Sequence, residues 1–352
     1  MNDPNPTNPC GLYGIDFIEF VSPEPAKLDV LFKAFGFSRT MQHENRPVDL
    51  YRQGDITLLV NRDPAGFAAR FGALHGPSIC SMGWRVRDAA AALAAATSRG
   101  GTAGTGDHQG DGRALPAVRG IGDSLVYFVE GFARADHWGR LGFVPLELPD
   151  RVPAKGFTAV DHLTHNVEKG TLGRWASFYK EVFGFTEVRY FDIRGAKTGL
   201  TSHALRSPCG SFCIPINEAD EAKSQVNEYL REYNGPGIQH LAFLTEDLLG
   251  SLQALEGSPI QVLDMDDAYY ASVFDRVPNV VEDKAEIRRR NVLVDGDAEG
   301  YLLQIFTKNL VGPIFIELIQ RRNHLSFGEG NFGALFRSIE REQARRGVFD
   351  MP

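Results

Sequence analysis

The chain of 352 residues has a formal net charge of −8, because 45 aspartates and glutamates outnumber 37 lysines and arginines. This acidic balance disfavours nucleic acids and anionic membrane surfaces as partners, and no apolar run is long enough to predict a transmembrane helix. Residues 1–10 lack the apolar core of a secretory signal and only four cysteines occur, so we expect a cytoplasmic protein with reduced thiols.

The first half of the chain predicts two strand and helix pairs. Residues 14–20 form an apolar run typical of a buried strand, and residues 28–37 follow as an amphipathic helix that ends in Phe-Gly-Phe. Residues 76–82 predict a further strand, and Asp88 precedes a second helix at residues 89–98.

The second half repeats this order. Residues 159–165 correspond to the first strand, and residues 175–185 correspond to the first helix, with the same Phe-Gly-Phe ending. Residues 235–241 align without a gap with their counterpart in the first half, and Asp247 precedes a helix at residues 248–255. Each half is therefore predicted to contain two βαβββ units, and the tandem repeat favours one α+β architecture used twice.

Two segments between these elements have the composition of loops. Residues 100–112 are Gly-rich and polar and contain neither a dinucleotide-binding glycine pattern nor a P-loop, so we predict a surface loop there. Residues 149–157, with two prolines, predict the linker between the halves. The predicted domains are residues 1–150 and residues 151–352.

The two halves differ at positions that could bind a metal. His162 and His240 in the second half align with Phe17 and Ser81 in the first half. A lone carboxylate such as Glu147 could not hold iron in the first half. We therefore predict that the C-terminal domain alone binds metal and that the N-terminal domain is a metal-free scaffold.

Three residues each lie in a short apolar run that predicts a buried strand: His162, His240 and Glu317. Glu147 is the candidate counterpart of Glu317 in the first half. Two imidazoles and one carboxylate from separate strands form the 2-His-1-carboxylate set that holds non-haem iron with open positions. The alternatives are a neutral histidine in the core and, for the carboxylate, an ion pair with Arg321 or Arg322.

The segment around His162 allows a second metal hypothesis. If residues 160–167 formed a helix, His162 and His165 would share one face and could bind zinc. The segment is short and β-branched, and as a strand it places the two histidines on opposite faces. The alignment of His162 with an apolar phenylalanine favours the strand, with His162 facing inward.

Longer motifs around these residues carry a family resemblance. The motifs are Asp-His-Leu-Thr-His-Asn-Val at 161–167, Gly-Ile-Gln-His-Leu-Ala at 237–242, Leu-Gln-Ile-Phe-Thr at 303–307, Phe-Ile-Glu at 315–317 and Phe-Gly-Glu-Gly-Asn-Phe at 327–332. With them, the chain resembles the 4-hydroxyphenylpyruvate dioxygenase family of the vicinal oxygen chelate superfamily over nearly its whole length. The resemblance implies two barrel-like, half-open mixed sheets and one Fe(II) per subunit, held by His162, His240 and Glu317.

The same resemblance implies a substrate site. It gives catalytic roles in orienting the substrate to Ser202, Asn217, Gln225 and Gln239, and substrate-binding roles to Pro215, Gln304, Phe306, Phe315, Asn331, Phe332 and Phe336. The residues themselves leave other roles open. Phe306 and Phe315 suit a hydrophobic core equally well, Asn217 suits a helix cap, and Gln225 suits a solvated helix face.

The C-terminal segment predicts an amphipathic helix at residues 332–346. Phe332, Leu335, Phe336 and Ile339 have the spacing of one helix face, and Gly347 is a stop signal. The pattern alone predicts a helix packed on the core. The family resemblance implies that this helix gates the iron pocket, with glycines at 328 and 330 as a hinge.

The activity that the resemblance implies is the conversion of 4-hydroxyphenylpyruvate and O2 to homogentisate and CO2, a step of tyrosine and phenylalanine catabolism. A homo-oligomer, dimer or tetramer, is also expected. The alternatives are a 4-hydroxymandelate synthase, a metal-free sequestering protein of the same fold, and an extradiol dioxygenase, for which His203 is the nearest candidate for an additional catalytic histidine.

Overall fold

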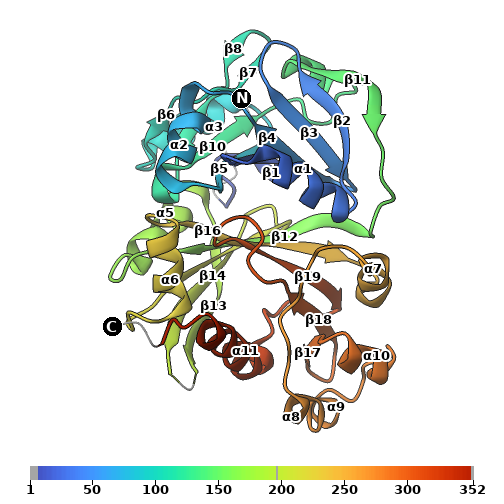
Figure 1. Ribbon diagram of the computed structural model, residues 1–352. Coiled ribbons are helices and arrows are strands. Elements are labelled where there is room, and N and C mark those ends of the chain that lie inside the picture. Colours follow the sequence, from blue (N-terminus) through green and yellow to red (C-terminus); the bar gives the residue numbers. More distant parts are fainter. Residues whose placement is uncertain (1–6, 196, 350–352) are drawn as a thin grey trace.

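The computed structural model describes residues 7–195 and 197–349. The ends of the two predicted domains, residues 1–6 and 350–352, lie outside the described residues. Figure 1 shows the N-terminal half, coloured blue to green, stacked on the C-terminal half, coloured yellow to red, with one large mixed sheet in each half. Among the described residues, no helix is both long enough and apolar enough to span a membrane.

The N-terminal sheet has nine strands in the order β11-β2-β3-β4-β1-β5-β10-β9-β6. Its strands are β1 (Leu12–Val21), β2 (Ser38–His43), β3 (Val48–Gln53), β4 (Ile56–Asn61), β5 (Ser78–Val86), β6 (Ala103–Gly104), β9 (Ala117–Arg119), β10 (Leu125–Val129) and β11 (Phe143–Asp150). A separate pair is formed by β7 (Gln109–Gly110) and β8 (Arg113–Ala114). The helices of this half are α1 (Pro25–Ala34), α2 (Gly66–His75), α3 (Ala89–Ser98) and α4 (His137–Arg140), with a 3-10 turn at Ile121–Asp123.

The C-terminal sheet has eight strands in the order β13-β14-β15-β12-β16-β19-β18-β17. Its strands are β12 (Phe157–Asn166), β13 (Thr186–Arg194), β14 (Gly199–Arg206), β15 (Cys213–Glu218), β16 (Gly237–Thr245), β17 (Leu293–Gly296), β18 (Tyr301–Phe306) and β19 (Phe315–Arg322). The helices are α5 (Leu172–Phe183), α6 (Gln225–Glu232), α7 (Leu248–Ala254), α8 (Asp267–Tyr270), α9 (Val273–Arg276), α10 (Lys284–Arg289) and α11 (Phe332–Arg345), with a 3-10 turn at Glu329–Asn331.

The pairing of the strands confirms the predicted tandem repeat. In the first half β1 runs parallel to β4 and antiparallel to β5, and in the second half β12 runs parallel to β15 and antiparallel to β16. The parallel pair of β5 and β10 likewise matches that of β16 and β19. Asp88 and Asp247 cap α3 and α7 in the same way, each accepting a hydrogen bond of 2.9 Å from a backbone N–H of the first turn.

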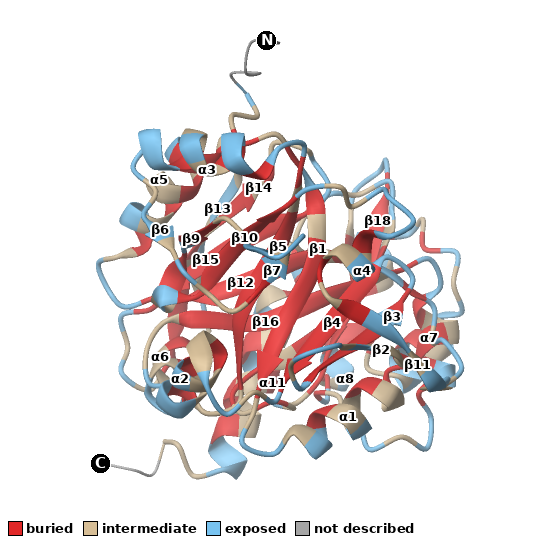
Figure 2. Cartoon of the chain, turned by 90° about the horizontal axis from the view of Figure 1, so that it is seen from above, coloured by how far each residue is buried: buried red, intermediate tan, exposed pale blue. Residues whose placement is uncertain are grey.

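The two halves share one hydrophobic core. Viewed from above in Figure 2, the central strands are buried and the outer faces of the helices are exposed. Phe37, from the first half, packs against Phe243, from the second, with ring centroids 5.4 Å apart. Trp84 packs against Phe183 at 5.0 Å. Burial of such large apolar side chains at the contact favours association of the halves.

The prediction of a surface loop at residues 100–112 is wrong for the central part of this segment. His108 is only 3% exposed. The neighbouring Asp107 accepts hydrogen bonds from the backbone N–H groups of Phe67 and Ala68 in the first turn of α2, at 2.8 and 3.0 Å. A carboxylate is favoured at a helix N-terminus, where the first N–H groups have no partner within the helix. This contact draws the polar segment inward.

Candidate metal centre

Three adjacent strands of the C-terminal sheet place His162, His240 and Glu317 together. His162 lies on β12, His240 on β16 and Glu317 on β19, and these strands are neighbours in the sheet. Glu317 Oε2 lies 3.0 Å from His162 Nε2 and 3.6 Å from His240 Nε2. Among the described residues, this is the one group of three or more possible metal ligands whose atoms converge, all within 4.8 Å of one another.

The spacing of these three atoms fits a shared metal ion. Ligand atoms about 2.1 Å from one ion and about 90° apart lie about 3 Å from each other, close to the distances found here. Imidazole nitrogens together with one carboxylate suit a first-row divalent metal. All three side chains are buried, so the charge of Glu317 needs a positive partner that the two histidines or a cation can supply.

The Nδ1 atoms of both histidines are held away from this point. His162 Nδ1 lies 2.7 Å from Asp161 Oδ2, and His240 Nδ1 lies 3.2 Å from Gln239 Oε1. Because both partner atoms are acceptors, each Nδ1 carries a proton, so each Nε2 is the atom that can bind a metal once the metal takes the place of a proton next to Glu317. Hydrogen bonds of this kind fix the orientation and the tautomer of histidine ligands.

Two β-bulges explain how a residue next to each histidine reaches its ring. Neighbours in a regular strand point to opposite faces. In the pairing of β12 with β16, Asp161 is an extra residue on β12 and Gln239 is an extra residue on β16. A bulge re-aims the side chain of the extra residue, so Asp161 and Gln239 can contact the histidines that follow them.

Asp161 is in turn held by Arg321. The Nε and Nη2 atoms of Arg321 donate to the two carboxylate oxygens at 2.7 and 2.8 Å. Burial opposes the charge of Asp161, but the hydrogen bonds and the charge of Arg321 outweigh burial and hold the pKa of this carboxyl well below its usual range. Arg321 therefore pairs with Asp161 and not with Glu317, contrary to the alternative considered from the sequence.

The three candidate ligands influence each other's ionisation. Burial lowers the pKa of His162, but the charge of Glu317 and the hydrogen bond to Asp161 outweigh it and raise this pKa to about 9. Burial raises the pKa of Glu317, yet the charge of His162 holds it below its ordinary value. Burial lowers the pKa of His240. Glu317 thus attracts positive charge to this point, which a metal cation can supply in place of a proton.

A cavity lies next to the three residues and brings together most of the predicted substrate residues. Aromatic and polar groups line it from seven strands, β12 to β16 with β18 and β19, and from the helices α6 and α11. The predicted residues among them are Ser202, Pro215, Asn217, Gln225, Gln239, Phe306, Phe315, Phe332 and Phe336. Leu335 and Ile339, on the apolar face of α11, line it as well, so the predicted amphipathic helix turns its apolar face to this cavity.

Gln304 and Asn331 do not line the cavity, and their substrate roles stay predictions. The Gln304 amide is fully buried behind Gly328 and has no hydrogen-bond partner among the described residues. Asn331 Oδ1 accepts hydrogen bonds from the hydroxyl of Tyr269 at 2.7 Å and from Arg276 at 3.3 Å.

Several alternatives from the sequence do not fit the structure. Residues 160–167 lie largely in β12, and His165 Nδ1 bonds to the carbonyl of Leu163, so His162 and His165 do not form a zinc pair. His203 pairs with Glu187 at 2.9 Å and does not line the cavity, so it is not placed as an extra catalytic histidine. Asn217 lies in β15 and is not a helix cap.

The sequence analysis assigned no site role to Asp161, Phe191 and Phe327, and it considered Arg321 only as a partner of Glu317. Phe327 lies 5.6 Å from the ring of His162 and, with Phe191, lines the cavity. Asp161 and Phe327 belong to the motifs quoted above. The available signal was the position of Asp161 next to the candidate ligand His162, and of Phe327 next to the predicted hinge glycines. For Phe191, on the edge strand β13, no signal was available.

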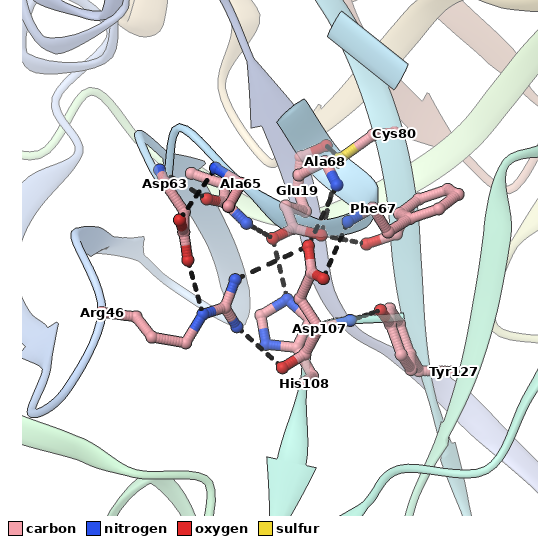
Figure 3. Close-up of polar contacts among 12 residues, drawn as sticks. Glu19, Arg46, Asp63, Ala65, Phe67, Ala68, Cys80, Asp107, His108 and Tyr127 are labelled. Atoms are coloured by element: carbon pink, nitrogen blue, oxygen red, sulfur yellow. Dashed lines mark hydrogen bonds and ion pairs between the residues drawn. The ribbon is translucent and has the colours of Figure 1, made fainter. Parts of the chain in front are cut away.

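The corresponding place in the N-terminal half is filled by side chains. The register of β5 with β10 makes Tyr127, not Glu147, the counterpart of Glu317; Glu147 is exposed on β11. Phe17 packs against Tyr127 at 6.1 Å and against His108 at 5.1 Å. Figure 3 shows His108 and Tyr127 beside the buried carboxylate of Glu19, which His108 contacts at 2.8 Å. These aromatic rings occupy the space that the second half uses for its candidate ligands.

Comparison with known proteins agrees with this fold and site. A family model described as "Hydroxyphenylpyruvate dioxygenase, HPPD, N-terminal" matches residues 6–143, and one described as "Glyoxalase/Bleomycin resistance protein/Dioxygenase superfamily" matches residues 159–287. A 4-hydroxyphenylpyruvate dioxygenase of Legionella pneumophila is 43% identical over 347 residues, 97% of this chain and 97% of the relative. The chain belongs to the 4-hydroxyphenylpyruvate dioxygenase family. It is therefore an enzyme of the dioxygenase class.

Other members and neighbours widen the comparison. Protein MelA of Shewanella colwelliana is 53% identical over 342 residues, 97% of this chain and 98% of that protein. Among solved structures, a fusion of a xylose isomerase-like TIM barrel with a 4-hydroxyphenylpyruvate dioxygenase matches with a TM-score of 0.80 at 30% identity, covering 96% of this chain and 54% of the fusion. A triple mutant of 4-hydroxymandelate synthase from Streptomyces coelicolor matches with a TM-score of 0.79 at 27% identity, covering 94% and 99%. The predicted vicinal oxygen chelate fold is confirmed.

Proposed function

We propose that this enzyme is an Fe(II)-dependent 4-hydroxyphenylpyruvate dioxygenase that forms homogentisate and CO2 from 4-hydroxyphenylpyruvate and O2. The observation that carries the proposal is the convergence of His162 Nε2, His240 Nε2 and Glu317 Oε2 at one wall of a cavity lined by phenylalanines and amides. The relatives named 4-hydroxyphenylpyruvate dioxygenase, at 41–43% identity over nearly the full chain, support it.

The triad suits iron because it leaves coordination positions free for a chelating substrate and for oxygen. Held by these residues, iron would be chelated by the carboxylate and keto oxygens of the 2-oxo acid and would supply oxygen activation, with electrons from oxidative decarboxylation of the substrate itself. The protein supplies oriented ligands: Asp161 and Gln239 hold the Nδ1–H groups, so both Nε2 atoms face one point. No second 2-oxo acid is required as a co-substrate.

The polar groups of the cavity are oriented before a substrate binds. Gln239 Nε2 donates to Gln225 Oε1 at 2.9 Å, which leaves the amide N–H groups of Gln225 free to donate to a substrate oxygen. Asn217 Nδ2 donates to Asn166 Oδ1 at 3.3 Å, which leaves Asn217 Oδ1 to accept from a phenol. Amide donors and an amide acceptor in one cavity suit an aromatic 2-oxo acid with a hydroxyl group.

The apolar walls have a separate role. Phe306 and Phe315 line the cavity from the sheet, and Phe332 and Phe336 line it from α11. These rings can hold the substrate ring and exclude water from the reacting atoms. We propose that α11, within the predicted gating segment 332–346, moves to admit the substrate, because it forms one wall of the cavity.

The test is to incubate the iron-loaded protein with 4-hydroxyphenylpyruvate and O2 and to identify the product. Homogentisate with stoichiometric CO2 is expected, whereas hydroxymandelate would make the enzyme a 4-hydroxymandelate synthase. Binding of the substrate without turnover in the iron-loaded protein would favour a sequestering protein. Glu317→Ala should lose both iron and activity, and His203→Ala, outside the cavity, should keep both.

Two expectations accompany this function and stay predictions. We propose a cytoplasmic location, because a reducing compartment keeps iron in the ferrous state. The four cysteines are all free, which is compatible with such a compartment. We also propose a homo-oligomer, a dimer or tetramer, which sedimentation measurements would test.

A further inference from the structure

Arg321 stands on the same strand and the same face as the candidate ligand Glu317. The two residues are four positions apart on β19, and side chains alternate between faces along a strand. The Arg321 side chain is 13% exposed and extends under the motif that contains His162. A nearly buried guanidinium at this place needs a partner for each of its N–H groups.

One side of the guanidinium binds Asp161, the residue that accepts a hydrogen bond from His162. Its Nε and Nη2 atoms grip both oxygens of Asp161, and Asp161 Oδ2 also accepts from His162 Nδ1 at 2.7 Å. Fork-like pairing of arginine with a carboxylate is directional as well as strong. The plane of the Asp161 carboxylate, and with it the ring of His162, is therefore set by Arg321.

The other side of the guanidinium holds the segment that leads to the gating helix. Arg321 Nη1 donates to the backbone carbonyls of His324 at 3.1 Å and Ser326 at 2.6 Å. The guanidinium carbon also lies 5.8 Å from the ring centroid of Phe327. Phe327 packs on the ring of His162 and lines the cavity. One side chain thus contacts the support of a metal ligand and the chain that covers the cavity.

The N-terminal half contains a comparable arginine–aspartate pair whose other contacts do not reach a candidate metal ligand. Arg85 Nε donates to Asp16 Oδ1 at 3.1 Å, and Asp16 is the bulge residue that corresponds to Asp161. The Arg85 side chain is 18% exposed, close to the value for Arg321. Its remaining donors bind Asp55, and its guanidinium carbon lies 5.8 Å from the ring centroid of Phe132. The second oxygen of Asp16 lies 2.9 Å from Nε2 of the buried His137. An arginine thus grips the bulge aspartate in both halves, from β5 in one and from β19 in the other, but only the Arg321–Asp161 pair joins a metal-facing histidine to backbone carbonyls of a segment over the cavity.

We propose that Arg321 is a positioning residue that couples the metal centre to the segment 323–328 over the cavity. Through Asp161 it fixes the ring of His162, and through the carbonyls of His324 and Ser326 it holds Phe327 against that ring. The inference rests on the proposed metal site. Metal binding should then stabilise segment 323–328, although none of its residues belongs to the candidate ligand set.

The experiment compares the full-length wild type with Arg321→Lys, Asp161→Asn and the matched control Arg85→Lys. Lysine keeps the charge but cannot form the fork and reach both carbonyls at once. Co²⁺ titration, followed by its visible absorption bands, gives the metal affinity. Hydrogen–deuterium exchange of segment 323–328, measured with and without Co²⁺, gives the coupling.

The expected result has two parts. Arg321→Lys and Asp161→Asn should weaken Co²⁺ binding by about 10- to 100-fold, as loss of a support for a ligand does. In Arg321→Lys, exchange at 323–328 should also be faster and no longer respond to metal. Arg85→Lys should match the wild type in both measurements. If Arg321→Lys does not fold, Asp161→Asn is used for both measurements: its Co²⁺ affinity tests the support of His162, and its hydrogen–deuterium exchange at 323–328 tests the coupling.

The outcomes that overturn the inference are distinct from those that overturn the function. Wild-type affinity and wild-type exchange in Arg321→Lys would refute the positioning role while leaving the metal site intact. An equal loss of affinity in Arg85→Lys would make the effect one of general stability and would refute it as well. A wild-type protein that binds no divalent metal would instead refute the proposed function itself.

Discussion

The substitution Glu19→Gln tests how the N-terminal half stabilises a charge in its core. Glu19 is 1% exposed, and its carboxylate accepts hydrogen bonds from Ser81 Oγ at 2.5 Å and Asn61 Nδ2 at 2.8 Å, beside His108 (Figure 3). Burial opposes ionisation, but the charge of His108 and these hydrogen bonds outweigh it and lower the pKa from 4.5 to about 2. The ionised form is therefore more stable in the folded protein than in the unfolded chain.

The size and the sign of the effect follow from this pKa. Each pKa unit is worth roughly 1.4 kcal/mol, so the change corresponds to about 3 kcal/mol of folding free energy. Because the folded-state pKa is depressed, this stabilisation is present above pH 4.5 and is lost as the pH falls towards 2. Glutamine keeps the shape of Glu19 but not the charge, so the variant should be about 3 kcal/mol less stable at pH 7.

Denaturant unfolding of the wild type and Glu19→Gln between pH 7 and pH 2 measures the difference. The gap in unfolding free energy should shrink below pH 4.5 and nearly vanish near pH 2. Glu24→Gln, which removes an exposed ion pair with Lys27, is the control and should change stability by less than about 1 kcal/mol at any pH. A gap between wild type and Glu19→Gln that stays constant with pH would refute the argument, as would the absence of any gap at pH 7.

Three further outcomes are expected. Gly328→Ala should destabilise the protein and speed proteolysis of residues 323–332, because φ is +80° and a Cβ would lie 2.5 Å from a buried glutamine amide. The control Gly347→Ala, at φ +74° with no atom within 4 Å, should lower the free energy of unfolding by only about 1–2 kcal/mol. Equal losses of unfolding free energy in the two variants would contradict this. Glu340→Gln should loosen α11, because the carboxylate accepts hydrogen bonds from the backbone N–H and the hydroxyl of Thr198 at 3.0 and 3.2 Å; amide exchange there should rise, and unchanged exchange would count against it. Gln239→Leu should weaken Co²⁺ binding by about 10- to 100-fold, because a ligand loses the acceptor of its Nδ1–H; an unaltered titration would dismiss this role.

Elements with strong local signals were predicted closely from the sequence. The helix expected at residues 89–98 is α3, Ala89–Ser98, and the one expected at 332–346 is α11, Phe332–Arg345. The linker expected at 149–157 is the stretch between β11 and β12, which end and begin at Asp150 and Phe157. In these cases the signal lies within the segment or directly beside it: apolar spacing, an aspartate cap and a stopping glycine for the helices, and prolines for the linker.

Features that depend on distant contacts were not predicted. The burial of His108 requires a carboxylate 89 positions away in the chain. The role of Arg321 requires that β12 and β19 come close enough for a contact across 160 positions. The short helices α8 to α10, of four to six residues, carry too few turns for an apolar period to be distinguished. Periodicity within a segment is informative only when the partner of each side chain lies within that segment or on a predictable face.

The bulges explain why one half of a duplicated fold could acquire a metal centre. Both halves contain the same two extra residues: Asp16 and Cys80 in the first, Asp161 and Gln239 in the second. A bulge changes the direction in which the extra side chain points. In the second half histidines follow the bulge residues, which contact their Nδ1 atoms. In the first half Phe17 and Ser81 follow, and the bulge residues contact other partners: Asp16 pairs with Arg85 and His137, and Cys80 contacts Glu19. The backbone that can orient two ligands is thus common to both halves, and the side chains on it decide which half can bind a metal.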